Sequence, residues 1–193
     1  MKATNKTLYI LLFVLALVVN FAGINVRFFT DDPGLYASIA KYLIYKKDFF
    51  QLYTYNRDWL DKPHFPFWAI FASFKVFGIS EFAYRLPALL FFLLGLLYTY
   101  LFSRKYYDKE VAVMAVLILL TALNTILCNT DTRAEPYLMG LIMASIYHIA
   151  CLEERFSYKD LLLAALFTAF AIMTKGIFVV TAIYGGQIRQ LKP

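Results

Sequence analysis

Histidine and cysteine are scarce in this 193-residue chain, with two of each. The two histidines, His64 and His148, stand alone, and no pair of residues has the spacing of a structural zinc site. The two cysteines, Cys128 and Cys151, fall near opposite ends of consecutive apolar runs. If both runs cross a bilayer, its core of about 30 Å separates the two thiols. The sequence therefore predicts neither a histidine metal site nor a disulfide.

Several motifs and compositional features of soluble enzymes are also missing. The chain has no Gly-rich phosphate loop, no Gly-x-Ser-x-Gly turn and no dinucleotide fingerprint. It has no internal repeat, no low-complexity tract and no Gly/Ser linker. Soluble-type nucleotide chemistry is not indicated, and residues 1–193 are expected to form a single domain.

Apolar residues dominate what is present. The sequence is 61% hydrophobic and 19% aromatic, and its mean hydropathy is +0.61. These values exceed those of soluble domains and predict an all-α, polytopic membrane helix bundle. The formal net charge is +6, but the charges lie in gaps between apolar runs. They are better explained by orientation in the membrane and by lipid headgroups than by a nucleic-acid partner.

The apolar runs predict five spans and a short sixth stretch, at residues 8–26, 82–102, 111–127, 137–152, 161–174 and 177–188. The first run exceeds the apolar core of a signal peptide, about 7–15 residues, and is interpreted as an uncleaved span. We place the amino terminus in the cytoplasm because Lys and Arg concentrate in the loops that then fall inside. Residues 27–80, 129–135 and 175–176 then lie outside.

The first outer loop is expected to hold two interfacial helices. Asp32 is a good N-cap, and Pro33 suits the first turn of a helix whose apolar spacing continues over residues 34–46. An aromatic segment at residues 65–77 is too short to span the bilayer comfortably and ends at Gly78. Both helices are expected to lie at the outer membrane surface.

Three places with charged residues fall on this outer side, and together they suggest a pocket there. They are Asp31-Asp32 with Asp61-Lys62, the stretch Arg133–Glu135, and Lys175. Cations for a lipid-linked phosphate are available, as are carboxylates that can take up a proton. The candidate cations are Lys62, Arg133, Lys175 and Arg85, and the candidate carboxylates are Asp32 and Glu135. Plainer structural interpretations stay open for these residues. Asp32 could be no more than an N-cap, Asp61-Lys62 could form an exposed turn, and Glu135 could be an acid that favours the first turn of a helix. The same charges would also suit a proton relay in a transporter.

Five short motifs occur in a characteristic order along nearly the whole chain. They are Asp31-Asp32-Pro33-Gly34-Leu35-Tyr36-Ala37, Asp61-Lys62-Pro63 before Phe67-Trp68, Phe77-Gly78 with Ser80-Glu81 and Arg85-Leu86-Pro87, Arg133-Ala134-Glu135-Pro136-Tyr137, and Met173-Thr174-Lys175-Gly176. In this order they resemble the amino-terminal half of the GT-C glycosyltransferases, specifically the ArnT-like and protein O-mannosyltransferase-like family.

The resemblance implies an enzyme that passes a sugar from a polyprenyl-phosphate carrier to a lipid or protein acceptor of the cell envelope. The reaction would take place on the outer side of the bacterial inner membrane, by direct displacement with inversion. Asp32 matches the loop carboxylate that serves as catalytic base or orients the acceptor, and Lys62 matches the phosphate-binding lysine. Glu135 occupies the second acidic position, while Lys175 and Arg133 would help to bind the carrier phosphate.

Two departures from the family pattern affect these expectations. Pro33 stands where relatives often have Glu, so Asp31 is a candidate to share or replace the acidic role of Asp32. Relatives also carry more spans and usually a carboxy-terminal outer domain, so the chain is expected to be an amino-terminal portion. The sugar, the acceptor and a need for divalent metal stay open. The alternatives are a transporter or permease subunit and a non-catalytic relative that binds lipid or a partner.

Overall fold

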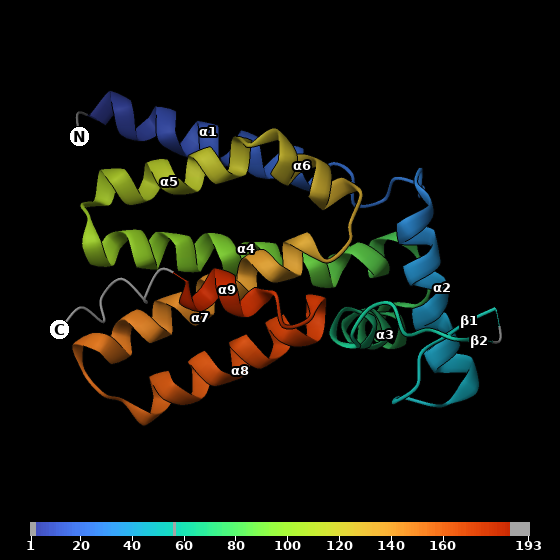
Figure 1. Cartoon of the computed structure of the whole chain (residues 1–193). Helices are drawn as coiled ribbons and strands as arrows, with labels where there is room; N and C mark the ends of the chain where they lie inside the picture. The colour runs from blue at the N-terminus through green and yellow to red at the C-terminus, as the bar shows by residue number, and fades with distance from the viewer. Residues whose placement is uncertain (1–2, 56, 186–193) are drawn as a thin grey trace.

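The computed structural model of the chain describes residues 3–55 and 57–185 (Figure 1). Within these residues the chain is a helix bundle whose regular elements are α1 (Ala3–Phe21), α2 (Asp31–Lys46), β1 (Tyr53–Thr54), β2 (Arg57–Asp58), α3 (Phe65–Phe77), α4 (Glu81–Tyr106), α5 (Lys109–Thr121), α6 (Leu123–Thr130), α7 (Glu135–Glu154), α8 (Tyr158–Lys175) and α9 (Val179–Tyr184). The two strands form one short antiparallel hairpin. The all-α fold class expected from the sequence is confirmed.

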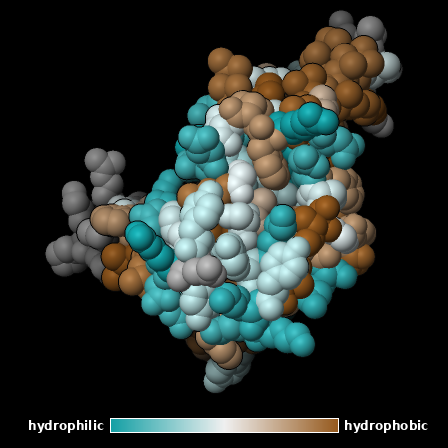
Figure 2. Space-filling view, turned by 90° about the vertical axis from the view of Figure 1, so that its right-hand side faces the viewer, coloured by the Kyte–Doolittle hydropathy of each residue, from teal (hydrophilic) through white to brown (hydrophobic). Residues whose placement is uncertain are grey.

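The long helices run side by side, and the short elements gather at one end of the bundle. Seen from that end, hydrophilic residues are spread over much of the surface (Figure 2). In Figure 1, α2, α3 and the hairpin lie at the right-hand end, and α2 crosses the direction of the long helices. By length and composition, α4 and α7 could each cross a membrane. The other expected spans correspond to α1, to α5 with α6, and to α8. Part of the expected stretch 177–188 lies outside the described residues.

The expected continuous span 111–127 is broken. The helices α5 and α6 meet at Ala122, whose ψ of 123° is extended, and they are bent by 55°. Two side chains accompany this break. The Thr121 hydroxyl donates to the carbonyl of Leu117 at 2.8 Å, and the Asn20 amide of α1 donates to the carbonyl of Leu120 at 2.8 Å. Back-bonding of this kind bends helices and satisfies carbonyls that lose their helical partners.

The helix α2 begins earlier than its N-cap signal predicted. It starts at Asp31, and Thr30 occupies the N-cap position without a side-chain hydrogen bond to the backbone of the first turn. The prediction that Asp32 caps this helix was therefore wrong, and its carboxylate is left for other contacts. The expected aromatic helix is confirmed at Phe65–Phe77, and Gly78 follows it with a positive φ of 77°.

Apolar packing fixes α2 against α3 and the start of α4. One cluster is formed by Ile39, Leu43, Leu52 and Phe67, and a second by Ala37, Ala40, Ile70, Phe74, Ala83 and Tyr84. Burial of this apolar surface stabilises the folded state by about 25 cal/mol for each Å² removed from water. The first turn of α2, which carries Asp32, is thereby held at a fixed position at the end of the bundle.

The helices α4 and α7 approach closely through two glycines. A Cβ added to Gly140 would lie 2.2 Å from the carbonyl oxygen of Phe91, and one added to Gly95 would lie 2.6 Å from the Met139 side chain. Small residues allow such backbone contact between membrane helices. The start of α7, where Glu135 lies, is therefore tied directly to α4.

Arg85 joins α4 to two other segments from inside the protein. Its exposed fraction is 0%. Its Nε donates to the carbonyl of Thr130 at 2.9 Å, and its Nη1 donates to the carbonyls of Val26 at 2.6 Å and Ile24 at 3.3 Å. The guanidinium also lies 5.1 Å from the centre of the Phe28 ring. The structure thus gives Arg85 a structural role at these carbonyls. Its expected contact with a phosphate stays a prediction.

Replacement of Arg85 by Met should lower the stability of the fold by about 3–5 kcal/mol, because carbonyls buried around the guanidinium lose their donors. The measurement is the thermal unfolding midpoint of the purified chain in detergent. Arg104→Met, at the exposed far end of the same helix, is the matched control and should leave the midpoint nearly unchanged. Equal midpoints for the two variants would contradict the structural role of Arg85.

Candidate active site

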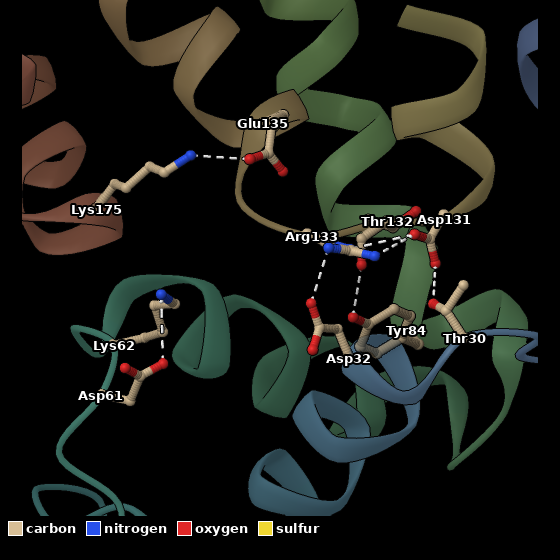
Figure 3. A network of polar contacts seen from close by, with 10 residues as sticks. All are labelled: Thr30, Asp32, Asp61, Lys62, Tyr84, Asp131, Thr132, Arg133, Glu135 and Lys175. Carbon is tan, nitrogen blue, oxygen red and sulfur yellow. Dashed lines mark hydrogen bonds and ion pairs between the residues drawn. The ribbon is translucent and has the colours of Figure 1, made fainter. Parts of the chain in front are cut away.

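A charged cluster forms where the α6–α7 connection meets the first turn of α2. The Nη1 of Arg133 lies 2.9 Å from Oδ2 of Asp32, and its Nη2 lies 2.8 Å from Oδ2 of Asp131 (Figure 3). Burial lowers the pKa of Arg133, but the hydrogen bond and charge of Asp131 and the charge of Asp32 outweigh it, so the pKa is raised. The guanidinium is therefore a permanent cation between two carboxylates.

Asp131 positions the guanidinium, and sequence reasoning missed it as a site residue. Its side chain is 19% exposed, against 42% for Arg133 and 44% for Asp32. It accepts hydrogen bonds from the Thr30 hydroxyl on one oxygen and from Arg133 Nε, at 3.1 Å, on the other. Its place two residues before Arg133, in the same polar break, is the one signal that could have identified it.

The α6–α7 connection is also fixed from α4. The Tyr84 hydroxyl donates to the carbonyl of Thr132 at 2.7 Å, and the Thr132 hydroxyl donates to the carbonyl of Asn129 at 2.9 Å. Tyr84 and Thr132 are each 1% exposed. These buried bonds hold the backbone that carries Arg133.

A second ion pair joins the start of α7 to the end of α8. Lys175 Nζ lies 2.9 Å from Glu135 Oε1, although the two residues are 40 positions apart. Glu135 and Pro136 begin α7, where an acid and a proline are both favoured in the first turn. Lys175 is the last residue of α8, where a cation is favoured. Glu135 and Lys175 can therefore favour the ends of their own helices and also form the ion pair with each other.

The Asp61–Lys62 pair lies on the loop that leads into α3. Lys62 Nζ is 3.3 Å from its neighbour Asp61, and Figure 3 shows this pair on a separate stretch of chain from the other two pairs. In the described part of the chain Lys62 makes no ion pair with Asp32 or Glu135. Asp31 is exposed and forms no ion pair there. The direct meeting of Asp32 with Asp61-Lys62 suggested by the sequence is not observed.

Tyr36 links these charges electrostatically and was not among the expected site residues. Burial raises the pKa of its phenol, and the charges of Asp32, Asp61 and Glu135 raise it further. The ring packs edge-on against Phe67, with centroids 5.4 Å apart. Tyr36 therefore remains a hydrogen-bond donor at neutral pH within electrostatic range of all three carboxylates.

The exposed charge pairs suit ligand binding better than fold stabilisation. Exposed ion pairs contribute about 0–1 kcal/mol to stability, so a bound anion can replace a carboxylate partner at small cost. Arg133 and Lys175 supply the cations, and Asp32 and Glu135 the carboxylates. Among the residues that the structure describes, no group of three or more His, Cys, Asp or Glu side chains could hold a metal ion.

Asp131→Ala should destabilise the fold by about 1–3 kcal/mol, because it removes a partly buried acceptor of three hydrogen bonds. Asp32→Ala removes one exposed ion pair and should cost less than about 1 kcal/mol. Thermal unfolding of both variants in detergent checks the difference. A larger loss for Asp32→Ala would show that Asp32, rather than Asp131, anchors Arg133.

Comparisons with known proteins agree with the fold. A family model described as dolichyl-phosphate-mannose-protein mannosyltransferase matches residues 61–185. The crystal structure of ArnT from Cupriavidus metallidurans in the apo state superposes with a TM-score of 0.82 at 20% identity, over 98% of this chain and 36% of that chain. The same protein bound to undecaprenyl phosphate gives 0.82 at 21% identity, over 98% and 37%.

The chain thus spans a little over a third of the length of those structures. A search of curated proteins gives no match. The family match covers more than half of the 193 residues and includes Asp61-Lys62, Arg133, Glu135 and Lys175. It confirms the resemblance to GT-C glycosyltransferases drawn from the order of motifs. This chain belongs to the dolichyl-phosphate-mannose-protein mannosyltransferase family.

Proposed function

We propose that this chain transfers a sugar from a polyprenyl-phosphate carrier to a lipid or protein acceptor of the cell envelope. The observation that carries the proposal is the convergence of Asp32–Arg133 and Glu135–Lys175, each at 2.9 Å, from segments far apart in the sequence. Phosphate needs cations and the acceptor needs a base, and both lie at one end of the bundle. The structure of ArnT with undecaprenyl phosphate supports a lipid-phosphate ligand by analogy.

Arg133 and Asp32 would change partners during the reaction. Arg133 is held by Asp131 through Nε and Nη2, while Nη1 contacts Asp32. A carrier phosphate that binds at Nη1 would displace Asp32, because guanidinium matches two phosphate oxygens at once. The Asp32 carboxylate would then be free to accept a proton from the acceptor hydroxyl. Binding of the donor would thus prepare the base.

The displacement itself balances in one step. The acceptor oxygen forms a bond to the anomeric carbon of the sugar, and the bond from that carbon to the phosphate oxygen breaks. The proton of the acceptor hydroxyl passes to Asp32, with Asp31 and Glu135 as the other candidate carboxylates. Polyprenyl phosphate leaves with the electron pair, and Arg133, Lys175 and Lys62 stabilise its charge. No covalent sugar intermediate is needed, and the anomeric configuration inverts.

We place the site on the outer face of the bacterial inner membrane, in a single membrane domain with its amino terminus in the cytoplasm. The charges at the opposite end of the bundle support this orientation. The last turn of α4 carries Arg104 and Lys105, and α5 begins with Lys109. Basic residues concentrate at the cytoplasmic ends of spans and in short cytoplasmic loops. Lys105 is also paired with Glu154 at the end of α7.

The test uses membranes that contain the full chain, or its Asp32→Asn/Lys62→Ala double variant, with radiolabelled polyprenyl-phosphate sugars. We expect transfer of the label to fall at least about 100-fold in the double variant, because it loses a general base and a phosphate cation. Carrier binding should also weaken. Asp58→Asn/Lys41→Ala is the matched control, since it removes one acid and one lysine outside the cluster, and it should retain transfer.

The possible results separate the proposals. Transfer that survives in the double variant would overturn the assignment of Asp32 and Lys62. Lys62-dependent carrier binding without transfer by the unaltered chain would limit its role to holding the donor. A chain that neither binds carrier nor transfers sugar would be a non-catalytic relative.

A further inference from the structure

An apolar groove lined by α1, α4 and α5 lies away from the candidate active site. It has a volume of about 370 Å³. In Figure 1, α5 runs between α1 and α4, and the α4–α5 turn lies at the end of the bundle opposite α2 and α3. Leu96 and Val116 are the most buried lining residues, at 5% and 6% exposed, whereas Phe13 and Leu97 are 36% and 51% exposed. The groove therefore has a closed floor and an open side.

The helix faces that line the groove each continue to a basic residue. On α4, Leu93 and Tyr100 line the groove, and Arg104 follows Tyr100 after one helical turn, on the same face. On α5, Lys109 precedes the lining residue Val113 by one turn, so these two also share a face. Arg104 and Lys109 flank the α4–α5 turn. Two cations therefore lie beyond the same end of the groove.

Neither of these cations is paired in the part of the chain that the structure describes. Arg104 donates to the carbonyl of Tyr107 at 3.3 Å and forms no ion pair, and the Lys109 side chain forms no ion pair or hydrogen bond there. By contrast, Lys105 is paired with Glu154. Membrane orientation accounts for basic residues at this end. It does not require that the two unpaired ones continue the faces that line the groove.

Two acids lie beside Lys109 in the sequence, and they leave its ammonium group available. The Asp108 carboxylate caps α5, because it accepts a hydrogen bond from the Val111 N–H at 2.8 Å. Glu110 is the next residue after Lys109 and so lies about 100° around the helix from it. An anion at the end of the groove can therefore approach Lys109 as well as Arg104.

The spacing along α4 matches one leaflet of a bilayer. Leu93 and Arg104 are about 16 Å apart along the helix, at a rise of about 1.5 Å per residue. Half of a hydrocarbon core of about 30 Å is about 15 Å. A lipid whose phosphate lies at Arg104 would therefore place its acyl chain along the groove as far as Leu93. Another helix could cover the same apolar wall, but it would leave both cations unpaired unless it carried acids at that depth.

We propose that this groove binds an acyl chain of an anionic phospholipid, whose phosphate is held by Arg104 and Lys109. Guanidinium and ammonium groups both bind phosphate oxygens, and basic pockets between membrane helices bind anionic headgroups. Tyr100 lies between the apolar wall and the cations. Its hydroxyl has no hydrogen-bond partner among the described residues, so it can donate to the lipid. The site is independent of sugar transfer, because it lies at the other end of the bundle from Asp32.

The test measures the thermal unfolding midpoint of the full chain, purified in detergent without lipid and then mixed with dioleoylphosphatidylglycerol or dioleoylphosphatidylcholine. A ligand that binds the folded state raises this midpoint. We expect phosphatidylglycerol to raise it by about 5 °C more than phosphatidylcholine, because the acyl chains are the same and the headgroups differ in net charge. Equal shifts with the two lipids would overturn the proposal.

Removal of the two cations tests the headgroup contact. Arg104→Gln/Lys109→Gln changes two exposed side chains, so its midpoint without lipid should equal that of the unaltered chain. Its excess shift with phosphatidylglycerol should fall below about 1 °C. Arg155→Gln/Lys159→Gln removes two exposed cations around the α7–α8 turn and should keep the shift. A full shift in the first variant, or an equal loss in the second, would overturn the assignment of Arg104 and Lys109.

A pair of matched substitutions on α5 tests the place of the acyl chain. Val113→Phe fills the groove and should also abolish the excess shift, whereas Val111→Phe makes the same change at a position that is 44% exposed and outside the groove. Leu97→Trp, on the exposed rim, repeats the test without altering the floor and should likewise abolish the shift. A full excess shift in both groove variants would overturn the binding of an acyl chain there.

Discussion

The buried guanidinium of Arg85 makes the contacts on which the arrangement of the α2–α3 end of the bundle depends. Three carbonyls, from Ile24, Val26 and Thr130, converge on it from the segments that follow α1 and end α6. Carbonyls outside regular helix hydrogen bonding need donors when they are removed from water. One side chain from α4 supplies them and so fixes where the α6–α7 connection starts. The positions of Asp131 and Arg133 follow from that point.

The parts of the fold that depend on local composition could be predicted from the sequence. The helix Phe65–Phe77 agrees with its expected limits, because the aromatic run and Gly78 define it locally. The break at Ala122 could not be predicted. It involves Asn20, which lies 100 residues from the carbonyl of Leu120 that it binds. The start of α2 was placed late for a similar reason: the cap signal of Asp32 is local, whereas the charge that Asp32 contacts belongs to Arg133.

In the candidate site, too, some features follow from the sequence and others depend on residues that are distant in the sequence. Membrane topology predicted that Arg133, Glu135 and Lys175 share one side, and the structure brings Glu135 and Lys175 together. Topology could not predict that Arg85 is buried while these residues are exposed, because an arginine near the start of a span normally reaches toward water. Its inward direction depends on carbonyls up to 61 residues away. Asp131 and Tyr36 were missed because their roles arise from neighbours in space rather than in sequence.

The contact between Gly140 of α7 and the Phe91 backbone of α4 limits how proteins built on this plan can diverge. There is no room for a side chain at Gly140. A single substitution there would push α7 away from α4, so this helix contact tolerates little change. The loop that carries Asp61 and Lys62 has exposed side chains and is free of that restriction. Divergence within the family is therefore expected at exposed positions of this loop around Asp61-Lys62, while the α4–α7 joint stays as it is.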